Sequence, residues 1–203
     1  MRHFTRTPCW DGPDDPGRNE IRGTLQLGET VMIDTVGGSD HDYEAAGDWK
    51  AGQISGANSV VRYSRYGGPF AIEGIEPDDW VAIKIEKMEV GPYGFYRNGG
   101  PLWGNWRAVA PVRDGLIHFP PDFVVPIRPM IGIIELGAVM GGGIERGGNM
   151  DFNAIQPGST VHIRAQQAGG LLSLGDTHAR MGDGELTGAG VEIDATVTVT
   201  VDR

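Results

Sequence analysis

The strongest constraint on the fold is a strict two-residue alternation near the end of the sequence. From Val191 to Val201 every second residue is apolar, and the residues between them are Glu, Asp or Thr. Side chains of a β-strand point alternately to opposite faces, so this pattern predicts a half-buried strand. Helical periodicity is limited to one short candidate, from Asp40 to Lys50. We therefore expect an all-β protein with little helix.

Three segments repeat a polar turn that is followed by an alternating strand. They read LQLGETVMIDT from Leu25, IEPDDWVAIKI from Ile75 and IQPGSTVHIRA from Ile155. Each turn carries Gly or Asp, which tolerate a positive φ or cap the backbone. Recurrence of one unit predicts an antiparallel, jelly-roll-like β-sandwich with similar halves, in a single domain over residues 1–203. Chance similarity among short strands is the alternative interpretation.

Glycine-rich stretches predict where the loops lie. The sequence has 33 Gly and 13 Pro, yet 39% of its residues are apolar, which is typical of a turn-rich folded chain. Pro92 to Ala108 and Gly137 to Gly148 show neither period and are expected to be ordered loops at one end of the sandwich, where chemistry is often found. Pro126 and Pro129 lack ladder donors, so this part of the chain is expected near a sheet edge.

Charge and cysteine content limit the possible partners. A net charge of -10 opposes binding to a phosphate backbone, so we expect no nucleic acid partner. No apolar run approaches the roughly eighteen residues of a membrane span, and the first ten residues lack a secretion signal, which predicts a cytoplasmic protein without a membrane partner. Cys9 is the single cysteine, so a metal would be held by His, Asp or Glu. The acidic residues around His41 are interpreted as a solvated loop or as a secondary metal-binding candidate.

The densest set of chemically active residues is GDTHARMGDGE, from Gly175 to Glu185. Asp176 and His178 are two residues apart and would project to the same side of an extended backbone. Gly182 and Gly184 would let the chain reverse, returning Asp183 and Glu185 toward the same point. Imidazole together with carboxylates suits zinc and related divalent ions. The alternative is a polar hairpin whose Asp residues cap their own turns.

A second candidate is GGNMD, from Gly147 to Asp151. The Asn149 amide can donate to and accept from a small amide, and Asp151 adds a carboxylate. Alone the motif is weak, because a Gly-Gly-Asn run is most often a turn.

Several blocks of the sequence resemble signature blocks of the acetamidase/formamidase family in order and internal spacing. They are residues 28–38 (GETVMIDTVGG), 68–91, 147–163 and 171–193 (LLSLGDTHARMGDGELTGAGVEI), which together extend along most of the chain. The resemblance implies a β-sandwich hydrolase that releases ammonia from a short aliphatic amide, usually as a homo-oligomer. The chain departs from the family pattern at residues 131–139 and at Arg164, and it is compressed between residues 92 and 146.

The matching motifs carry seven polar residues, and the needs of amide hydrolysis suggest a role for each. The predicted metal ligands are His178, Asp176, Asp151 and Asp34, with Zn²⁺ preferred and Ca²⁺ as the alternative. The predicted catalytic residues are Glu185, Asp183 and Asn149, with Glu185 moving a proton from water to the departing ammonia. Gly147, Gly148 and Asn149 are predicted to bind the substrate or its oxyanion.

Two further functions remain open from the sequence. One is a non-catalytic binding module with a structural calcium and a groove lined by aromatic residues, namely Tyr93, Phe95, Tyr96, Trp103 and Trp106. The other is a hydrolase of the same fold that acts on a cyclic or larger amide. Serine amidase chemistry is disfavoured because no Gly-x-Ser-x-Gly elbow is present. His3, His118 and His162 lack converging motifs, and Cys9 is a weak candidate nucleophile.

Overall fold

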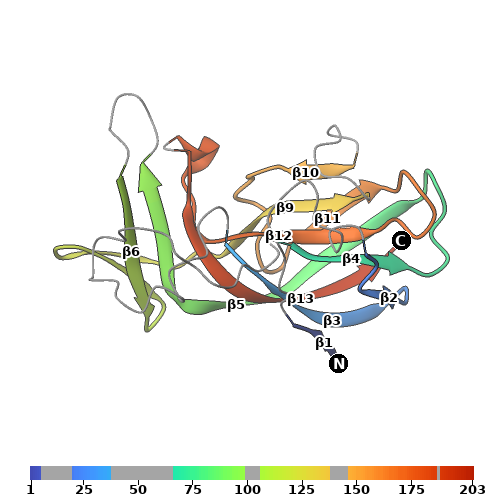
Figure 1. Ribbon diagram of the computed structural model, residues 1–203, viewed down its shortest axis with the longest axis horizontal. Helices are drawn as coiled ribbons and strands as arrows, with labels where there is room; N and C mark the ends of the chain where they lie inside the picture. The colour runs from blue at the N-terminus through green and yellow to red at the C-terminus, as the bar shows by residue number, and fades with distance from the viewer. Residues whose placement is uncertain (6–19, 38–65, 99–105, 138–145, 187) are drawn as a thin grey trace.

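A computed structural model describes residues 1–5, 20–37, 66–98, 106–137, 146–186 and 188–203 (Figure 1). Within these ranges the chain is built from β-strands, together with one short 3-10 turn, η2 (Asp183–Glu185). The predicted all-β class is therefore confirmed. In the described residues no helix is long and apolar enough to cross a membrane. The candidate helix from Asp40 to Lys50, and Cys9, lie outside the described residues.

One layer of the fold is organised around two long strands that occupy its centre. Its strands follow the order β11-β5-β13-β3-β1, with antiparallel pairing except between β1 and β3, which are parallel. These strands are β1 (Arg2–Phe4), β3 (Glu29–Thr35), β5 (Trp80–Asn98), β11 (Thr160–Arg164) and β13 (Val191–Asp202).

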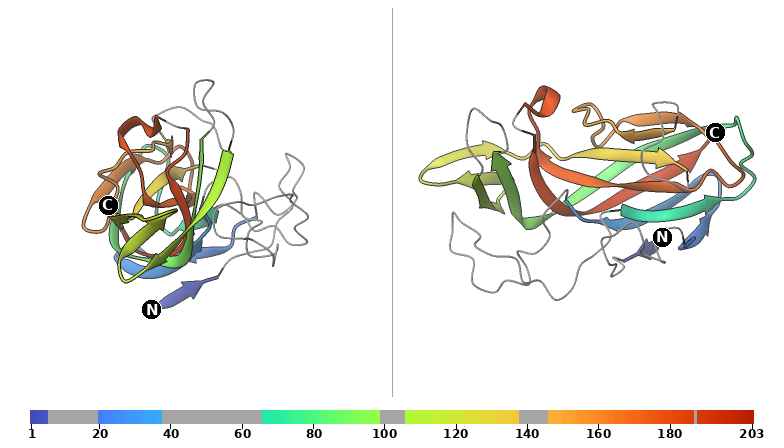
Figure 2. Two further views of the ribbon diagram at one scale, coloured as in Figure 1. Left: turned by 90° about the vertical axis from the view of Figure 1, so that its left-hand side faces the viewer. Right: turned by 45° about the horizontal axis from the view of Figure 1, so that its top comes forward.

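Within the described residues, the second layer consists of five strands centred on β12. Its order is β10-β9-β12-β4-β2, again antiparallel except for the parallel pair β2 and β4. These strands are β2 (Gly23–Leu25), β4 (Tyr66–Ile72), β9 (Met130–Leu136), β10 (Gly147–Asn149) and β12 (Leu172–Arg180). The two views of Figure 2 show these strands lying over β5 and β13. The sandwich is thus mainly antiparallel, with a parallel pair at one edge of each layer.

The two layers share a seam at one end, where β12 pairs with the start of β13. His178 lies opposite Glu192 and Arg180 opposite Val191, with a bulge between the two pairs. Beyond this seam the two strands diverge, because β13 continues beside β3 while β12 pairs with β9 and β4. Apolar side chains from both layers fill the space between them and form the main core. They include Val31, Ile33, Ile83, Ile134, Leu172, Leu174, Val197 and Val199.

The three repeated turns have the same backbone geometry. Their fourth residues, Gly28, Asp78 and Gly158, all have positive φ, at 78°, 74° and 94°. In each turn the next residue donates its N–H to the carbonyl three residues earlier, at 3.0, 3.2 and 3.0 Å. The four-residue turns begin at residues 26, 76 and 156, so the residue with positive φ is the third of each turn, which is typical of type II. The turns lead into β3, β5 and β11, so the repeat predicted from sequence places three strands in one layer.

The segment from Pro92 to Ala108 was predicted as a loop, and this prediction is wrong for its described part. Residues 92–98 continue β5, and Trp106 begins β6 (Trp106–Arg113), which pairs with β5. Strands β7 (Leu116–Phe119) and β8 (Phe123–Pro126) extend this sheet, visible at the left of Figure 1. Position 94 requires glycine, because an added Cβ would lie 2.5 Å from Val191 Cγ1.

The other predicted loop, Gly137 to Gly148, is described only at its two ends. Gly147 and Gly148 belong to β10, which pairs with β9. Pro126 ends β8, which is the last strand of the extension, so the predicted edge position of this proline is confirmed.

Strand β13 confirms the alternating pattern, but the prediction that only one face is buried is wrong. Glu192, Asp194 and Thr198 on its polar face are 5%, 5% and 7% exposed. Side chains on this face are covered by other segments and have polar partners inside the fold. The Asp194 carboxylate, for example, accepts the N–H of Gly37 at 3.4 Å. Part of this polar face lines the site described next.

Candidate metal centre

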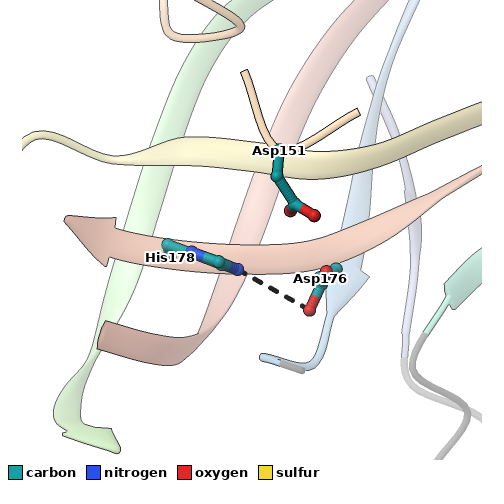
Figure 3. Close-up of side chains that lie close together, drawn as sticks. All are labelled: Asp151, Asp176 and His178. Carbon is teal, nitrogen blue, oxygen red and sulfur yellow. Dashed lines mark ion pairs between the residues drawn. The ribbon is translucent and has the colours of Figure 1, made fainter. Parts of the chain in front are cut away.

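Five ionisable side chains converge at the seam between β12 and β13. Asp176 and His178 come from β12, Glu192 from the start of β13, Asp151 from the segment after β10, and Glu185 from η2. Figure 3 shows the carboxylates of Asp151 and Asp176 turned toward the imidazole of His178. Residues far apart in the sequence therefore meet because two strands and two turns end at one place.

His178 is the centre of the cluster and is completely buried. Its Nε2 lies 3.4 Å from Glu192 Oε2 and 3.7 Å from Asp176 Oδ1. Two sets of residues offer ligand atoms that all lie within 4.8 Å of one another. They are Asp151, Asp176 and His178, and His178, Glu185 and Glu192.

Three buried atoms of the cluster have no hydrogen-bond partner among the described residues. They are Nδ1 and Nε2 of His178 and Oδ1 of Asp151. Leaving a buried polar atom unsatisfied costs about 1–3 kcal/mol, and native proteins rarely accept several at one point. A cation between these groups would satisfy Nε2 and the carboxylate oxygens together.

Two glycines allow the cluster to close. A Cβ at Gly132 on β9 would lie 2.6 Å from Asp151 Oδ1 and 2.8 Å from Asp176 Oδ2. A Cβ at Gly190 would lie 2.1 Å from His178 Nδ1. The backbone of Gly190 therefore closes the Nδ1 side of the ring, and Nε2 faces the carboxylates. The carbonyl of Gly132 also accepts the Asp151 N–H at 3.1 Å, which anchors that residue.

The backbone at the acidic residues adopts a conformation that side-chain-bearing residues rarely take. Asp151, Asp176 and Glu185 have φ values of 41°, 55° and 45°. Such left-handed residues cost of order 1 kcal/mol or more each and are found mostly at functional sites. The predicted convergence of Asp176 and His178 thus occurs, although Asp176 departs from a regular strand.

The electrostatics of the cluster favour bound positive charge. Burial raises the pKa of Asp151 to about 6, and the charges of Glu185 and Asp176 add to this rise. Burial disfavours the charged form of His178, but contact with Asp176 and the charges of Glu192, Asp176 and Glu185 outweigh it and raise its pKa to about 9. Four carboxylates around one imidazole repel one another, and either a proton or a metal ion relieves that repulsion.

The residues present fit a divalent ion. A neutral imidazole and several carboxylates form the ligand chemistry of zinc, whereas calcium prefers oxygen ligands throughout. Three of the four ligands predicted from sequence, His178, Asp176 and Asp151, lie together in the structure.

Other predicted site residues have different surroundings. The Oδ1 of Asp34 accepts a hydrogen bond from Thr196 Oγ1 at 2.7 Å and lies 2.8 Å from His3 Nε2; neither ligand set includes Asp34. Asp183 is exposed, and its Oδ1 accepts from Asn153 Nδ2 at 2.6 Å. Asn149 ends β10 and is hydrogen-bonded to Asp151, which lowers the pKa of that carboxyl in part.

The remaining histidines lie elsewhere. His162 is exposed on β11, and His118 lies next to Arg113, whose Nε–H it accepts at 3.3 Å. His41 lies outside the described residues.

Glu192 is a site residue that sequence reasoning missed. It was read as one of the polar residues on the solvent side of the last strand, but it is 5% exposed and faces His178. The available signal was its position at the start of the strand that follows the glycine-rich segment 182–190, where the chain must return toward the preceding strand.

The comparisons with known proteins agree with the fold and with the family resemblance. A model of the acetamidase/formamidase family matches residues 134–202, the segment that carries every residue of the cluster. A Schizosaccharomyces pombe protein named "Putative formamidase" is 24% identical, over 95% of this chain and 64% of its own length. The chain thus spans less than two thirds of that relative.

Solved structures show the same architecture over nearly the whole chain. A predicted acetamidase/formamidase from Thermoanaerobacter tengcongensis has a TM-score of 0.79 at 27% identity, covering 99% of this chain and 68% of its own. An acetamidase from Bacillus halodurans has a TM-score of 0.76 at 27% identity, covering 100% and 70%. The fold is also shared with a gamma lactamase from Delftia acidovorans, at 16% identity and a TM-score of 0.76 over 100% of this chain and 68% of its own.

Fold and site together define an all-β protein with a buried histidine and carboxylate cluster at the seam of a sandwich. The resemblance to the acetamidase/formamidase family that the sequence predicts is confirmed by the family match and by these structures.

Proposed function

We propose that this protein is a metal-assisted hydrolase of short linear amides, producing ammonia and a carboxylate. The observation that carries the proposal is the buried Nε2 of His178, which lies among four carboxylates and has no hydrogen-bond partner in the described part of the chain. The family resemblance supports the reaction class. The ligand chemistry supports a divalent ion, zinc in preference to calcium.

His178, Asp176 and Asp151 would hold the ion. Bound there, a divalent cation would polarise an amide carbonyl and lower the pKa of a water molecule. Asp176 and Glu192 keep Nε2 directed at the ion position, and Gly190 blocks the opposite side of the ring. This preorganisation limits the rotation that the imidazole could otherwise undergo.

Glu185 is the residue we assign to proton transfer. It is partly exposed, at the end of η2, and belongs to the second ligand set with His178. One oxygen of its carboxylate can accept a proton from water and return it to the amide nitrogen, which must be protonated to leave. Asn149 and the backbone of Gly147 and Gly148 lie next to Asp151 and are assigned to hold the amide. We assign no role to Asp34 or Asp183.

The first test is ammonia release by purified protein from formamide, acetamide, larger linear amides and a cyclic amide. Activity should disappear with a chelator and return with Zn²⁺. Glu185→Gln should lower kcat by about a hundredfold or more, in the range of general acid and base residues, while metal content stays unchanged. Glu89→Gln, an exposed exchange on β5 next to Lys87, is the matched control. Full turnover by Glu185→Gln would remove its assigned role.

Metal binding can be tested separately through Gly132. A methyl group at this position would enter the space between the Asp151 and Asp176 oxygens, so Gly132→Ala should weaken Zn²⁺ binding about tenfold or more. Gly182→Ala is the control, because an added Cβ there meets no atom within 4 Å. Equal metal affinity in both variants would argue against this ligand set.

The substrate panel separates the alternatives. Turnover of the cyclic amide alone would favour the same-fold hydrolase of another C–N bond. Bound metal with no turnover of any amide would favour the binding module. Phe95 cannot line the aromatic groove predicted for that module, because it is 1% exposed and packed against Val109. Trp103 and the side chain of Trp106 lie outside the described residues.

We also propose that the chain forms a homo-oligomer. The support is an apolar sheet edge. Phe123 and Val124 on β8 are 62% and 47% exposed, and β8 is the last strand of its sheet in the described chain. Exposed apolar edge strands are prone to pair with another chain.

A further inference from the structure

A cavity of about 510 Å³, open to solvent, lies beside the metal centre, between the β6–β8 extension and the loop that joins β12 to β13. Its walls include the aromatic rings of Tyr96, Phe119 and Phe123. The Tyr96 and Phe119 rings meet edge to face with centroids 4.9 Å apart, and Phe119 and Phe123 lie 5.8 Å apart. Its size and apolar lining are those of a small-molecule site.

Two arginines, Arg128 and Arg180, also line this cavity. Each is fixed by one hydrogen bond: Arg128 Nε donates to Gln156 Oε1 at 3.1 Å, and Arg180 Nη1 donates to the Pro126 carbonyl at 2.9 Å. Within the described part of the chain neither guanidinium forms an ion pair with a carboxylate. In a protein of net charge -10, two arginines that form no ion pair with a carboxylate of the described residues are a specific feature of this wall.

One carboxylate, that of Asp183, shares the cavity wall. Its Oδ1 accepts the amide N–H of Asn153, which also lines the cavity. The lining therefore carries two positive charges and one negative charge, and the uncompensated charge is positive. Guanidinium groups bind carboxylates through paired hydrogen bonds, and aromatic walls favour a flat apolar body.

We propose that this cavity binds an aromatic carboxylate, with its anion at Arg128 and Arg180 and its ring against Tyr96, Phe119 and Phe123. The site is separate from the metal centre. Gly190 forms part of the cavity wall, and the buried imidazole of His178 lies behind it and does not line the cavity. This inference does not depend on the proposed amide hydrolysis.

The test is a calorimetric titration of chelator-treated protein with benzoate and, separately, with its neutral counterpart benzamide. Saturable benzoate binding should persist without metal, and benzamide should bind at least about tenfold more weakly because it lacks the charge. Arg128→Gln and Arg180→Gln should each weaken benzoate binding about tenfold. Arg113→Gln changes an exposed arginine that does not line the cavity; it is the matched control and should bind as the parent does.

Asp183→Asn should increase benzoate affinity, and an increase cannot result from damage to the fold. Removing the one carboxylate of the wall should strengthen benzoate binding several-fold, and Phe123→Ala, a change at an exposed ring, should weaken it. The proposal is overturned if benzoate fails to bind, if benzamide binds equally well, or if both arginine variants bind as the parent does. Binding that requires Zn²⁺ would assign benzoate to the metal centre and would also overturn it.

Discussion

His178 shows how a single residue is made useful by what surrounds it. An isolated buried histidine would be neutral, because burial disfavours its charged form. Here Asp176, Glu185 and Glu192 reverse that preference and raise its pKa to about 9. A site that attracts a proton this strongly without metal is also a site that attracts a divalent cation, since both neutralise the same carboxylates.

The stability of the metal-free protein should decrease as pH rises. Relative to their ordinary values of 3.8 and 6.5, the pKa values of Asp151 and His178 are raised to about 6 and about 9. A raised pKa stabilises the fold while the group is protonated, so this stabilisation is complete below the ordinary pKa and disappears above the raised one. The free energy of unfolding should therefore fall between about pH 4 and 6, and again between about pH 6.5 and 9.

Urea unfolding of chelator-treated protein at pH 5, 7 and 9 measures this dependence. His178→Gln should abolish the decrease between pH 7 and 9. With Zn²⁺ restored the trend should weaken or reverse, because metal and protons compete for the same ligands. Greater stability of the metal-free protein at pH 9 than at pH 7 would contradict the electrostatic account of the site.

At the scale of elements, one turn design is used three times with different residues. Gly28 and Gly158 adopt positive φ without a side chain, whereas Asp78 adopts it with a side chain that forms an ion pair with Arg164. The hydrophobic residues that open the turns, Leu25, Ile75 and Ile155, are 0%, 2% and 4% exposed and anchor each turn to the core. Each turn thereby fixes which face of the following strand is buried.

Gly158→Ala should destabilise the turn before β11. An alanine in the left-handed region costs about 1–2 kcal/mol, and no neighbouring atom restricts the added Cβ, so the loss should come from the backbone alone. Thermal or urea unfolding measures it, with Gly182→Ala as a control at φ -81°. Asp78→Gly should change stability little, because relief of strain offsets loss of an exposed ion pair. Equal stability of Gly158→Ala and the parent would show that the turn can relax.

At the scale of the whole molecule, the two layers, the extension and the metal centre share β5, β12 and β13. The long β5 pairs with β11 and β13 in the sandwich and with β6 in the extension. The cavity that we assign to an aromatic carboxylate is formed where the β6–β8 extension meets the loop that joins β12 to β13. The edge strand β8 then leaves apolar side chains exposed at the far end.

The apparent mass in solution should exceed that of one 21.8 kDa chain. Val124→Lys should shift light-scattering mass toward the single chain, because a charged side chain on an edge strand disfavours pairing with another copy. Leu27→Lys, at a partly exposed turn residue, should leave the mass unchanged. A single-chain mass for the parent protein would contradict the oligomer, and an unchanged mass for Val124→Lys would place the interface elsewhere.

The sequence by itself determined features that depend on local order. Alternation from Val191 to Val201 and the three turns predict strands correctly, because side-chain direction and turn geometry follow from a few neighbouring residues. The pair Asp176 and His178 could be chosen because two residues on one strand necessarily lie close together. Loop prediction was wrong for residues 92–98 because long-range pairing with β6 and β13 stabilises a strand that has little pattern of its own.

Tertiary structure decided which distant residues meet. Asp151 reaches the site only because Gly132 leaves space for its carboxylate, and Glu192 is turned inward only because β13 pairs with β12 at His178. Contacts with His178 and Gly37 bury Glu192 and Asp194, on the face of β13 that the sequence pattern predicts to be exposed. Pairing of β13 with β3 places Asp34 beside Thr196, and the Asp34 carboxylate also lies next to His3. Contacts between segments far apart in the chain depend on packing and register, and no local pattern encodes either.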